Sequence, residues 1–304
     1  MASVIGMVEQ AFIDLSHGKA NMPPKAYLVV DQGDFRAMPA AVAGAAGIKW
    51  VNMHPQNTSH DLPSVMALLV YNDPLTGYPL AVMDATDITA YRTGATAAIA
   101  SKRLARKTSQ TLGLVGAGQQ SYTQLLAHVE LFDFKLIKVF DILSVAVDRF
   151  IESFPKYPVQ AASLQDVLAC DIVCTMTPSH EPFVIREWVM PGTHINAIGA
   201  DAKGKEELEP SILCEATVVV DSLEQAIGSG EVNVPITEGL FTAGEIYATL
   251  DEIVAGKKQG RKDDREITVF DSTGIAIEDI AVAKSVYDKA KAAGHYLSLD
   301  FVEE

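Results

Sequence analysis

The sequence predicts an α/β fold built from two parts: a doubly wound parallel sheet and a second, α+β unit. Residues 27–84 contain short β-rich runs with turns between them, which is typical of an antiparallel or mixed sheet. From Thr111 onward, Val- and Ile-rich runs alternate with helical patterns, as a parallel sheet covered on both faces requires. The length of 304 residues also suggests two domains or one large one.

Composition excludes several classes of protein. The chain is 48% hydrophobic and 21% charged, which excludes disorder, collagen and coiled coil as descriptions of the whole chain. Its 24 Lys and Arg against 39 Asp and Glu give a net charge of −15, so we expect neither a nucleic-acid nor a membrane partner. Three cysteines at this length favour a reducing compartment, and the N-terminus matches an amphipathic helix better than a signal peptide. We therefore expect a cytoplasmic protein.

The first part begins with a helix and continues with strands. Apolar residues from Val4 to Leu15 recur at helical spacing, and Gly18 is expected to end this helix. A long Ala-rich helix is expected over 87–106. The expected strands between the two helices cover residues 27–30, 35–40, 48–53, 65–71 and 79–84.

The second part alternates strands with helices. The expected strands cover residues 111–118, 136–141, 159–162, 171–177, 194–200, 217–221 and 266–271. The expected helical segments cover residues 119–131, 143–153, 163–169, 205–216, 243–255 and 277–293. The charged run between the last two segments is expected to be a solvated loop.

A glycine motif follows the first strand of the second part. The strand from Thr111 runs into Gly116-Ala-Gly118-Gln-Gln-Ser121, a G-x-G-x-x-S pattern that opens a helix. Gly116 allows the tight turn, Gly118 lets a pyrophosphate approach the backbone, and Ser121 is small enough for close packing. The helix N-terminus offers free N–H groups to the phosphates. A tight turn alone would explain the glycines, but the strand and helix around them favour a Rossmann-type dinucleotide site.

An acidic residue ends the next strand and indicates which dinucleotide is bound. Asp141 follows Gly116 by 25 residues, slightly beyond the usual interval of about 20. A carboxylate there accepts hydrogen bonds from both ribose hydroxyls and would repel a 2′-phosphate. We therefore expect NAD rather than NADP.

Four cations stand in apolar or conformationally restricted segments of the first part: Lys25, Arg36, Lys49 and Arg92. They either lie on a solvated sheet face or form a cluster that binds a carboxylate, and strand alternation does not decide between the two. Asp201 follows an apolar strand, at the edge where parallel sheets bind ligands. It is either a helix cap or a proton-transfer group, with Lys205 nearby.

No metal site is expected. Cys170 and Cys174 lack a second His or Cys pair at zinc-finger spacing, so we interpret them as small buried residues. His54, His60, His180 and His194 share no metal-ligand spacing either. The histidines are interpreted as structural or surface residues.

Together, six segments resemble the ornithine cyclodeaminase/μ-crystallin family, most of all its archaeal-type alanine dehydrogenases. The segments are RAMPA, GIKWVN, PLAVMDATDITAYRTGA, LVGAGQQS, HINAIGAD followed by GK, and FDSTGIAIEDIAVAK. The resemblance implies a homodimer. It also implies a substrate-binding and dimerisation domain (residues 1–108 with 276–304) and a Rossmann NAD-binding domain (residues 109–275).

The resemblance also implies a role for individual residues. Arg36 and Lys49 would bind the substrate carboxylate beside Lys25, and Arg92 would lie between substrate and cofactor. Asp201 would be catalytic, and Lys49 would take part in catalysis as well. The implied cofactor-binding residues are Arg92, Thr93, Gly116, Ala117, Gly118, Gln119, Gln120, Asp141, Thr177, Ser272 and Thr273.

The implied activity is NAD-dependent oxidative deamination of L-alanine to pyruvate and ammonia, by way of an imine. The segment between Arg36 and Lys49 is small and apolar, without an acid to bind a second amino group. This slightly favours alanine over ornithine. The alternatives are an ornithine cyclodeaminase, a ketimine reductase, or a μ-crystallin-like binding protein with little turnover. The chain departs from the family by beginning almost in its first helix, and by Ser121 at the third glycine position.

Overall fold

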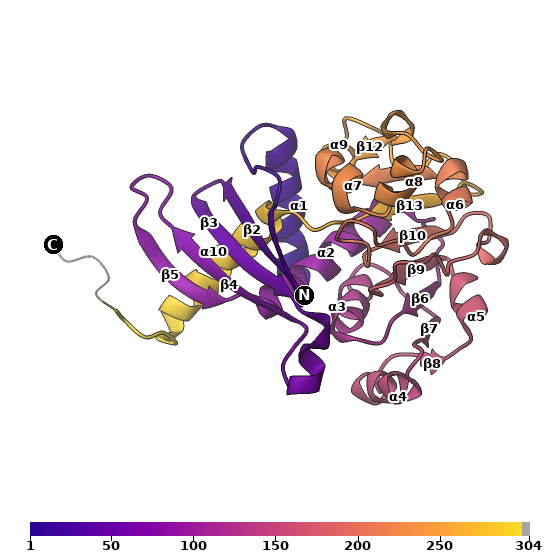
Figure 1. Cartoon of the computed structure of the whole chain (residues 1–304), viewed down its shortest axis with the longest axis horizontal. Helices are drawn as coiled ribbons and strands as arrows, with labels where there is room; N and C mark the ends of the chain where they lie inside the picture. The colour runs from indigo at the N-terminus through magenta and orange to yellow at the C-terminus, as the bar shows by residue number, and fades with distance from the viewer. Residues whose placement is uncertain (300–304) are drawn as a thin grey trace.

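The chain forms two separate sheets, joined by one long helix (Figure 1). This computed structural model describes residues 1–299. The connecting helix α2 (Thr86–Leu104) is buried along most of its length and contacts elements of both sheets. The expected α/β fold with a parallel sheet is confirmed.

The first sheet has five antiparallel strands in the order β1-β2-β3-β4-β5. Helices α1 (Ala2–Ser16) and α10 (Ala276–Ala293) pack together and cover one face of it. Gly18 follows the end of α1 with a φ of +70°, as a C-terminal glycine does. The strands are β1 (Ala26–Val30), β2 (Gly33–Val42), β3 (Ala45–Met53), β4 (Val65–Asn72) and β5 (Pro79–Asp84).

Alternation along these strands sends charged side chains to the covered face. On β3, Lys49 and Val51 are buried whereas Trp50 between them is 42% exposed. Leu68, which pairs with Trp50, and Val82 are also exposed. The face away from α10 is therefore open and apolar.

The second sheet has eight parallel strands in the order β12-β11-β13-β10-β9-β6-β7-β8. From β6 the chain adds β7 and β8 on one side and then β9 and β10 on the other, so the strand order reverses between β6 and β9. Parallel sheets bind ligands at the carboxyl ends of the strands at such a point. The strands are β6 (Thr111–Val115), β7 (Leu136–Phe140), β8 (Val159–Ala161), β9 (Ile172–Thr175), β10 (His194–Ala197), β11 (Thr217–Val220), β12 (Ala248–Thr249) and β13 (Thr268–Asp271).

Helices and short 3-10 turns fill the connections. The remaining helices are α3 (Gln119–His128), α4 (Ser144–Ser153), α5 (Leu164–Leu168), α6 (Pro210–Glu215), α7 (Leu223–Ser229), α8 (Asn233–Thr237) and α9 (Leu250–Val254). The 3-10 turns are η1 (Pro55–His60), η2 (Arg186–Trp188) and η3 (Ala243–Glu245). Within residues 1–299, no helix is long and apolar enough to cross a membrane.

Two of the expected helices are wrong. The segment 205–216 is helical only from Pro210. Proline disfavours the helical conformation of the residue before it and is itself well suited to the first position of a helix. The segment 243–255 is interrupted by strand β12, which pairs with β11. Thr249 then starts α9 with a capping box to Glu252. Helices α7 and α8 were not expected.

The proposed division into two domains remains a prediction. All five strands of the first sheet lie within residues 1–108, and all eight of the second lie within 109–275. Helix α10, from the C-terminal part, packs on the first sheet. The last five residues of the proposed segment 276–304 lie outside the described residues.

Helices α2 and α3 approach closely at Gly94, where a Cβ atom would lie 2.4 Å from the Thr123 carbonyl oxygen. We expect Gly94→Ala to lower the free energy of unfolding by about 1–3 kcal/mol, because a packed helix pair must separate. Gly6, on α1, is the control: no atom lies within 4 Å of its added Cβ. Gly6→Ala should raise the free energy of unfolding by about 0.5–1 kcal/mol. Urea denaturation measures both, and equal effects would contradict the close packing at Gly94.

Candidate active site

One cavity of about 460 Å³ joins the first sheet to the carboxyl ends of the second. Strands β2 and β3 and helix α2 form one side, and the loops after β6, β9, β10 and β13 form the other. The predicted site residues that line it are Lys25, Arg36, Lys49, Arg92, Thr93, Gly118, Gln119, Gln120, Thr177, Asp201, Lys205, Ser272 and Thr273. The fold thus brings together residues that are spread along the sequence from Lys25 to Thr273.

Three predicted cofactor residues lie beside this cavity, outside its lining. Gly116 has a φ of +98°, the left-handed conformation that the tight turn after β6 needs. Asp141, directly after β7, accepts hydrogen bonds from the backbone N–H groups of Ala117 (2.7 Å) and Leu143 (2.9 Å). These bonds hold the Asp141 carboxylate in place next to the glycine loop.

The loop and its surroundings fit a dinucleotide. A Cβ atom added at Gly118 would meet no atom within 4 Å, so the backbone there is open to an approaching phosphate. Helix α3 begins directly after Gly118 and points its N-terminal N–H groups at that space. The Asp141 carboxylate stands at the neighbouring strand end, where the ribose would lie.

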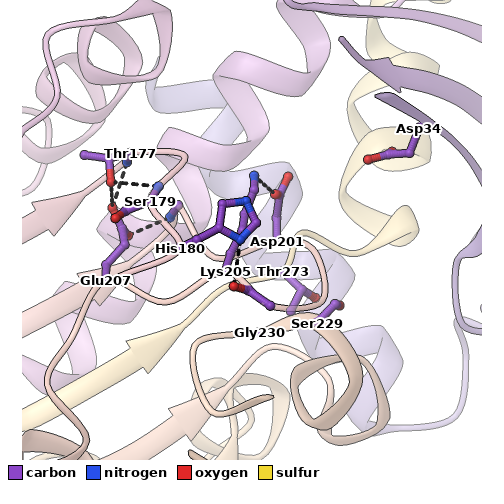
Figure 2. Close-up of polar contacts among 12 residues, drawn as sticks. Asp34, Thr177, Ser179, His180, Asp201, Lys205, Glu207, Ser229, Gly230 and Thr273 are labelled. Carbon is purple, nitrogen blue, oxygen red and sulfur yellow. Dashed lines mark hydrogen bonds and ion pairs between the residues drawn. The ribbon is translucent and has the colours of Figure 1, made fainter. Parts of the chain in front are cut away.

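The first charge cluster joins the two sides of the cavity through Arg36. Its guanidinium donates from Nε to Asp34 (2.6 Å) and from Nη1 to Asp201 (2.6 Å). The second oxygen of Asp201 accepts from Lys205 Nζ at 2.7 Å, a contact shown in Figure 2. Asp201 is therefore held between two cations, one from strand β2 and one from the segment between β10 and α6.

This pairing determines the protonation of Asp201. Burial alone would raise its pKa, but the charges of Arg36 and Lys205 outweigh burial and hold the pKa of Asp201 well below its usual range. In this arrangement Asp201 is an anion at neutral pH. Any loss of one of these cations from Asp201 would raise its pKa toward the usual range.

The second cluster is fully buried and centres on Asp279 of α10. Lys49 Nζ lies 2.8 Å from Asp279 and 3.2 Å from the Thr89 hydroxyl. Arg92 donates from Nε to Asp279 (3.1 Å) and from Nη1 to Glu278 (2.6 Å). One helix from the C-terminal part thus holds two cations of the N-terminal part.

Sequence reasoning missed the acids of both clusters: Asp34, Glu278 and Asp279. A signal was present for the last two, because a Glu-Asp pair stands inside the apolar stretch Ile277–Ala283 of a helix. Charged residues that are fully buried are almost always paired. The identity of their partners depends on the contact between α10 and the first sheet.

Two lysines in the cavity have unusually low pKa values. Burial lowers the pKa of Lys49 to about 7, although Asp279 partly opposes this. Burial and the nearby Arg36 lower the pKa of Lys25 to about 8. Lys25 Nζ donates to the backbone carbonyl of Thr273 and forms no ion pair within residues 1–299. Both lysines can therefore exchange protons near neutral pH.

The charged residues of the lining determine what the cavity can bind. Its lining has five cations, and Asp201 is the acidic residue among them. Such a site can bind a small carboxylate beside a dinucleotide and move a proton there. The wall near η1 is mostly apolar and comprises Met38, Val51, Met53, Pro55, Pro63 and Val65, together with the polar Asn52 and Ser64.

Comparison with known protein families gives one match over nearly the whole chain. The model of the ornithine cyclodeaminase/mu-crystallin family matches residues 1–294. An alanine dehydrogenase of Archaeoglobus fulgidus is 49% identical over 292 residues, which cover 95% of this chain and 91% of that protein. The resemblance expected from the sequence motifs is confirmed.

Solved structures agree with this match. An archaeal alanine dehydrogenase dimer with bound NAD superposes with a TM-score of 0.97 at 47% identity, covering 99% of this chain and 95% of that one. Delta(1)-pyrroline-2-carboxylate reductase of Thermococcus litoralis, in complex with NADH and L-proline, gives a TM-score of 0.93 at 40% identity. That match covers 96% of this chain and 93% of the reductase.

The buried cluster generates a stability prediction. Asp279→Asn should lower the free energy of unfolding by about 3–5 kcal/mol at neutral pH, because Lys49 and Arg92 lose a shared buried carboxylate. The control is Asp288→Asn on the same helix, which breaks the exposed pair with Lys284 and should cost less than about 1 kcal/mol. Urea denaturation of both variants tests this. A cost below 1 kcal/mol for Asp279→Asn would contradict the assigned pairing.

Proposed function

We propose that this chain, which belongs to the ornithine cyclodeaminase/mu-crystallin family, is an NAD-dependent alanine dehydrogenase. The reaction is L-alanine + NAD⁺ + H₂O giving pyruvate + NH₄⁺ + NADH + H⁺. One observation carries the proposal: a single cavity holds Arg36, Lys49 and Asp201 beside the glycine loop. The 49% identity to an alanine dehydrogenase supports the choice of substrate.

The lining of the cavity supports a short, uncharged side chain on the substrate. Asp201 is the acid of the lining described for residues 1–299, and Arg36 and Lys205 already engage both of its oxygens. The δ-ammonium of ornithine would lose its hydrogen bonds to water there, each worth about 1.5–3 kcal/mol for a charged group. A methyl group has no such requirement and suits the apolar wall.

Arg36 and Lys49 are the proposed ligands of the substrate carboxylate. A guanidinium binds a carboxylate with two parallel hydrogen bonds, which fixes the substrate's orientation. When Arg36 turns its Nη1 toward the substrate, Asp201 loses one of its two hydrogen-bonded cations and keeps Lys205, with Lys25 nearby. The pKa of Asp201 then rises toward its usual range, so substrate binding itself prepares Asp201 for proton transfer.

Asp201 is the proposed proton carrier for the hydrolysis of the imine. After oxidation at Cα, a water molecule attacks the imine carbon, and a carboxylate at Asp201 can accept the proton of that water. The same group returns a proton to the nitrogen as ammonia leaves. General acid–base help of this kind is typically worth about 10²–10⁴-fold in rate.

NAD is the proposed cofactor, and when bound it accepts a hydride from the substrate. Asp141 supports NAD over NADP, because its carboxylate is held by two backbone N–H groups where a 2′-phosphate would lie. Solved relatives carry NAD or NADH. The roles of Arg92, Thr93, Thr177, Ser272 and Thr273 as cofactor contacts are proposed from their place in the cavity lining.

A homodimer is the proposed assembly, with the open face of the first sheet as its interface. Trp50, Leu68 and Val82 expose apolar surface on this face, and such a patch marks an interaction site. The archaeal relative with a TM-score of 0.97 is a dimer. Light scattering that gives the mass of one chain would contradict this.

We also propose a cytoplasmic location. The three cysteines of the chain are free thiols in the structure, as a reducing compartment would keep them. Recovery of the protein in a periplasmic or secreted fraction would contradict this location.

The function is tested by assaying NADH oxidation with pyruvate and ammonium. Wild type should turn over, and Asp201→Asn should lose at least about 100-fold in kcat with an unchanged Kd for NADH, because an amide cannot exchange the proton. NADPH should be a poor substitute for NADH. Proline formation from ornithine, or reduction of Δ1-pyrroline-2-carboxylate without pyruvate turnover, would assign one of the family's other activities instead.

Asp34→Asn is the matched control for Asp201→Asn. Asp34 also holds Arg36, with two hydrogen bonds, but it does not line the cavity. If Asp201 transfers a proton, Asp34→Asn should mainly raise the KM for pyruvate and leave kcat within about tenfold. Equal kcat losses in both variants would show that Asp201 acts only as an ion-pair partner of Arg36 and does not transfer a proton.

The lysine pKa values predict how substrate binding depends on pH. Lys49 and Lys25 lose their charge as the pH rises through about 7 and about 8. The KM for pyruvate should therefore rise at least about tenfold between pH 7 and pH 9, measured at saturating NADH and ammonium. Because neither lysine is assigned to the cofactor, the KM for NADH should stay constant. A flat pyruvate KM would show that neither lysine needs its charge for binding.

A further inference from the structure

Glu207 is a buried carboxylate with no role in the chemistry described above. Its side chain is fully buried and accepts four hydrogen bonds from two neighbouring loops. Oε1 accepts from the backbone N–H (2.7 Å) and the hydroxyl (2.7 Å) of Thr177, and Oε2 accepts from the Thr175 hydroxyl (2.6 Å) and the Gly199 N–H (3.0 Å). Figure 2 shows Glu207 beside Thr177. The four donors match the acceptor capacity of an ionised carboxylate.

These bonds join the carboxyl ends of two adjacent strands at the cavity. Thr175 ends β9, whereas Gly199 follows the end of β10. Thr177 and Gly199 both line the cavity, and an added Cβ at Gly199 would lie 2.2 Å from the Thr177 carbonyl oxygen. Asp201 stands two residues beyond Gly199 and donates its backbone N–H to the Gly199 carbonyl. The Glu207 carboxylate therefore lies at the base of the loop that carries Asp201.

The backbone around Glu207 is part of the same support. The N–H groups of Phe183 and Val184 donate to the Glu207 carbonyl oxygen. Lys205, two residues earlier, reaches Asp201 from the other side. The extended segment 205–209 thus spans the strand ends and supplies two side chains to the loop above.

Two more buried acids continue the support behind Glu207. Glu231 Oε1 accepts from the backbone N–H groups of Glu207 (2.8 Å) and Leu208 (2.6 Å). Asp271, at the end of β13, accepts from the backbone of Glu231 and Val232. Each carboxyl group therefore holds the backbone of the segment that carries the next one.

The hydrogen bonds indicate where protons reside in this series. Among residues 1–299, Glu207, Glu231 and Asp271 have no ion pair, so three buried negative charges would repel one another. Glu231 Oε2 and Asp271 Oδ1 have no hydrogen-bond partner, which leaves each of these oxygens free to carry a proton. Burial raises the pKa of Asp271 to about 8 and, with the nearby Glu207, raises that of Glu231. Burial raises the pKa of Glu207 as well, but its four hydrogen-bond donors oppose that rise, so Glu207 is the acid of the three whose surroundings best stabilise a negative charge.

We propose that Glu207 is a positioning residue whose ionised carboxylate sets the loops after β9 and β10, and so the places of Thr177 and Asp201. Glu231 and Asp271 support it as uncharged acids. The inference rests on the proposed function only in assigning Asp201 to proton transfer. The positioning of the Thr177 loop can be tested by cofactor binding alone.

The test compares Glu207→Gln with two isosteric controls, Glu231→Gln and Asp271→Asn. In Glu207→Gln an NH₂ group replaces an acceptor oxygen, so a backbone N–H is left facing a donor. We expect a Kd for NADH about tenfold higher. We expect kcat with pyruvate to be about 100-fold lower, the loss that a shift of a catalytic group by about 1 Å can cause. The acid limb of the kcat–pH profile should move to higher pH, because Asp201 lies farther from Arg36 and Lys205. Both controls should stay within twofold of wild type.

Several results would overturn the proposal. A purely structural role for Glu207 would lower the melting temperature while leaving the Kd for NADH, the KM for pyruvate and the pH profile of folded enzyme unchanged. If Glu231→Gln lost as much NADH affinity and kcat as Glu207→Gln, the proposal would have assigned the negative charge to the wrong acid. If wild type lacks alanine dehydrogenase activity, the proposed function fails, and the NADH titrations of the three variants still decide the positioning role.

A second variant covers the case in which Glu207→Gln does not fold. The variant Thr175→Val removes one of the four donors and keeps the carboxylate, the Thr177 hydroxyl and both backbone N–H groups. Thr175 does not line the cavity, so this variant should weaken NADH binding only through Glu207, by about twofold or more. Wild-type affinity in folded Thr175→Val would overturn the proposal.

Discussion

The cost of burying charge shapes this protein more than any other constraint. Lys49 is fully buried, and an isolated ammonium in that position would be strongly unfavourable. It is stable there because Asp279 lies 2.8 Å away, on a helix 230 residues further along the chain. The same carboxylate also holds Arg92. The N-terminal sheet, the connecting helix α2 and the C-terminal helix α10 are therefore tied together at one buried point.

The pairing of each cation determines what it can do in the cavity. Arg92 has two buried carboxylates, which outweigh its burial and raise its pKa, so it is a permanent charge held in place. Arg36 is shared between Asp34 and Asp201, so one of its partners lies across the cavity. Lys25 contacts a carbonyl oxygen and keeps a lower pKa. The site thus contains a cation paired within the buried cluster, a cation paired across the cavity and a titratable cation.

Much of the fold follows from local patterns that the sequence shows directly. Strand β5 and the positions of α3, α4 and α10 agree with the expected segments to within a few residues, because their apolar periodicity is strong. The glycine loop could be recognised because its residues are adjacent and each has a steric reason. Segment 205–209 could not be recognised. Its charged residues suggested a helix, whereas Pro210 and the buried contacts of Glu207 keep it extended.

The sequence by itself singled out the cations, Asp201 and the dinucleotide loop as the candidate site, because residue type and neighbours in the chain are enough to identify such candidates. Only the tertiary structure decided which carboxylate neutralises which cation. Glu278 and Asp279 become partners through the packing of α10 on the first sheet, whereas Asp34 lies only two residues from Arg36 on the same strand. Contacts between residues far apart in the sequence depend on how elements pack, and local patterns carry no information about such distances. The pKa values of Lys49 and Asp201, and so the protons available for the reaction, are for that reason properties of the folded chain.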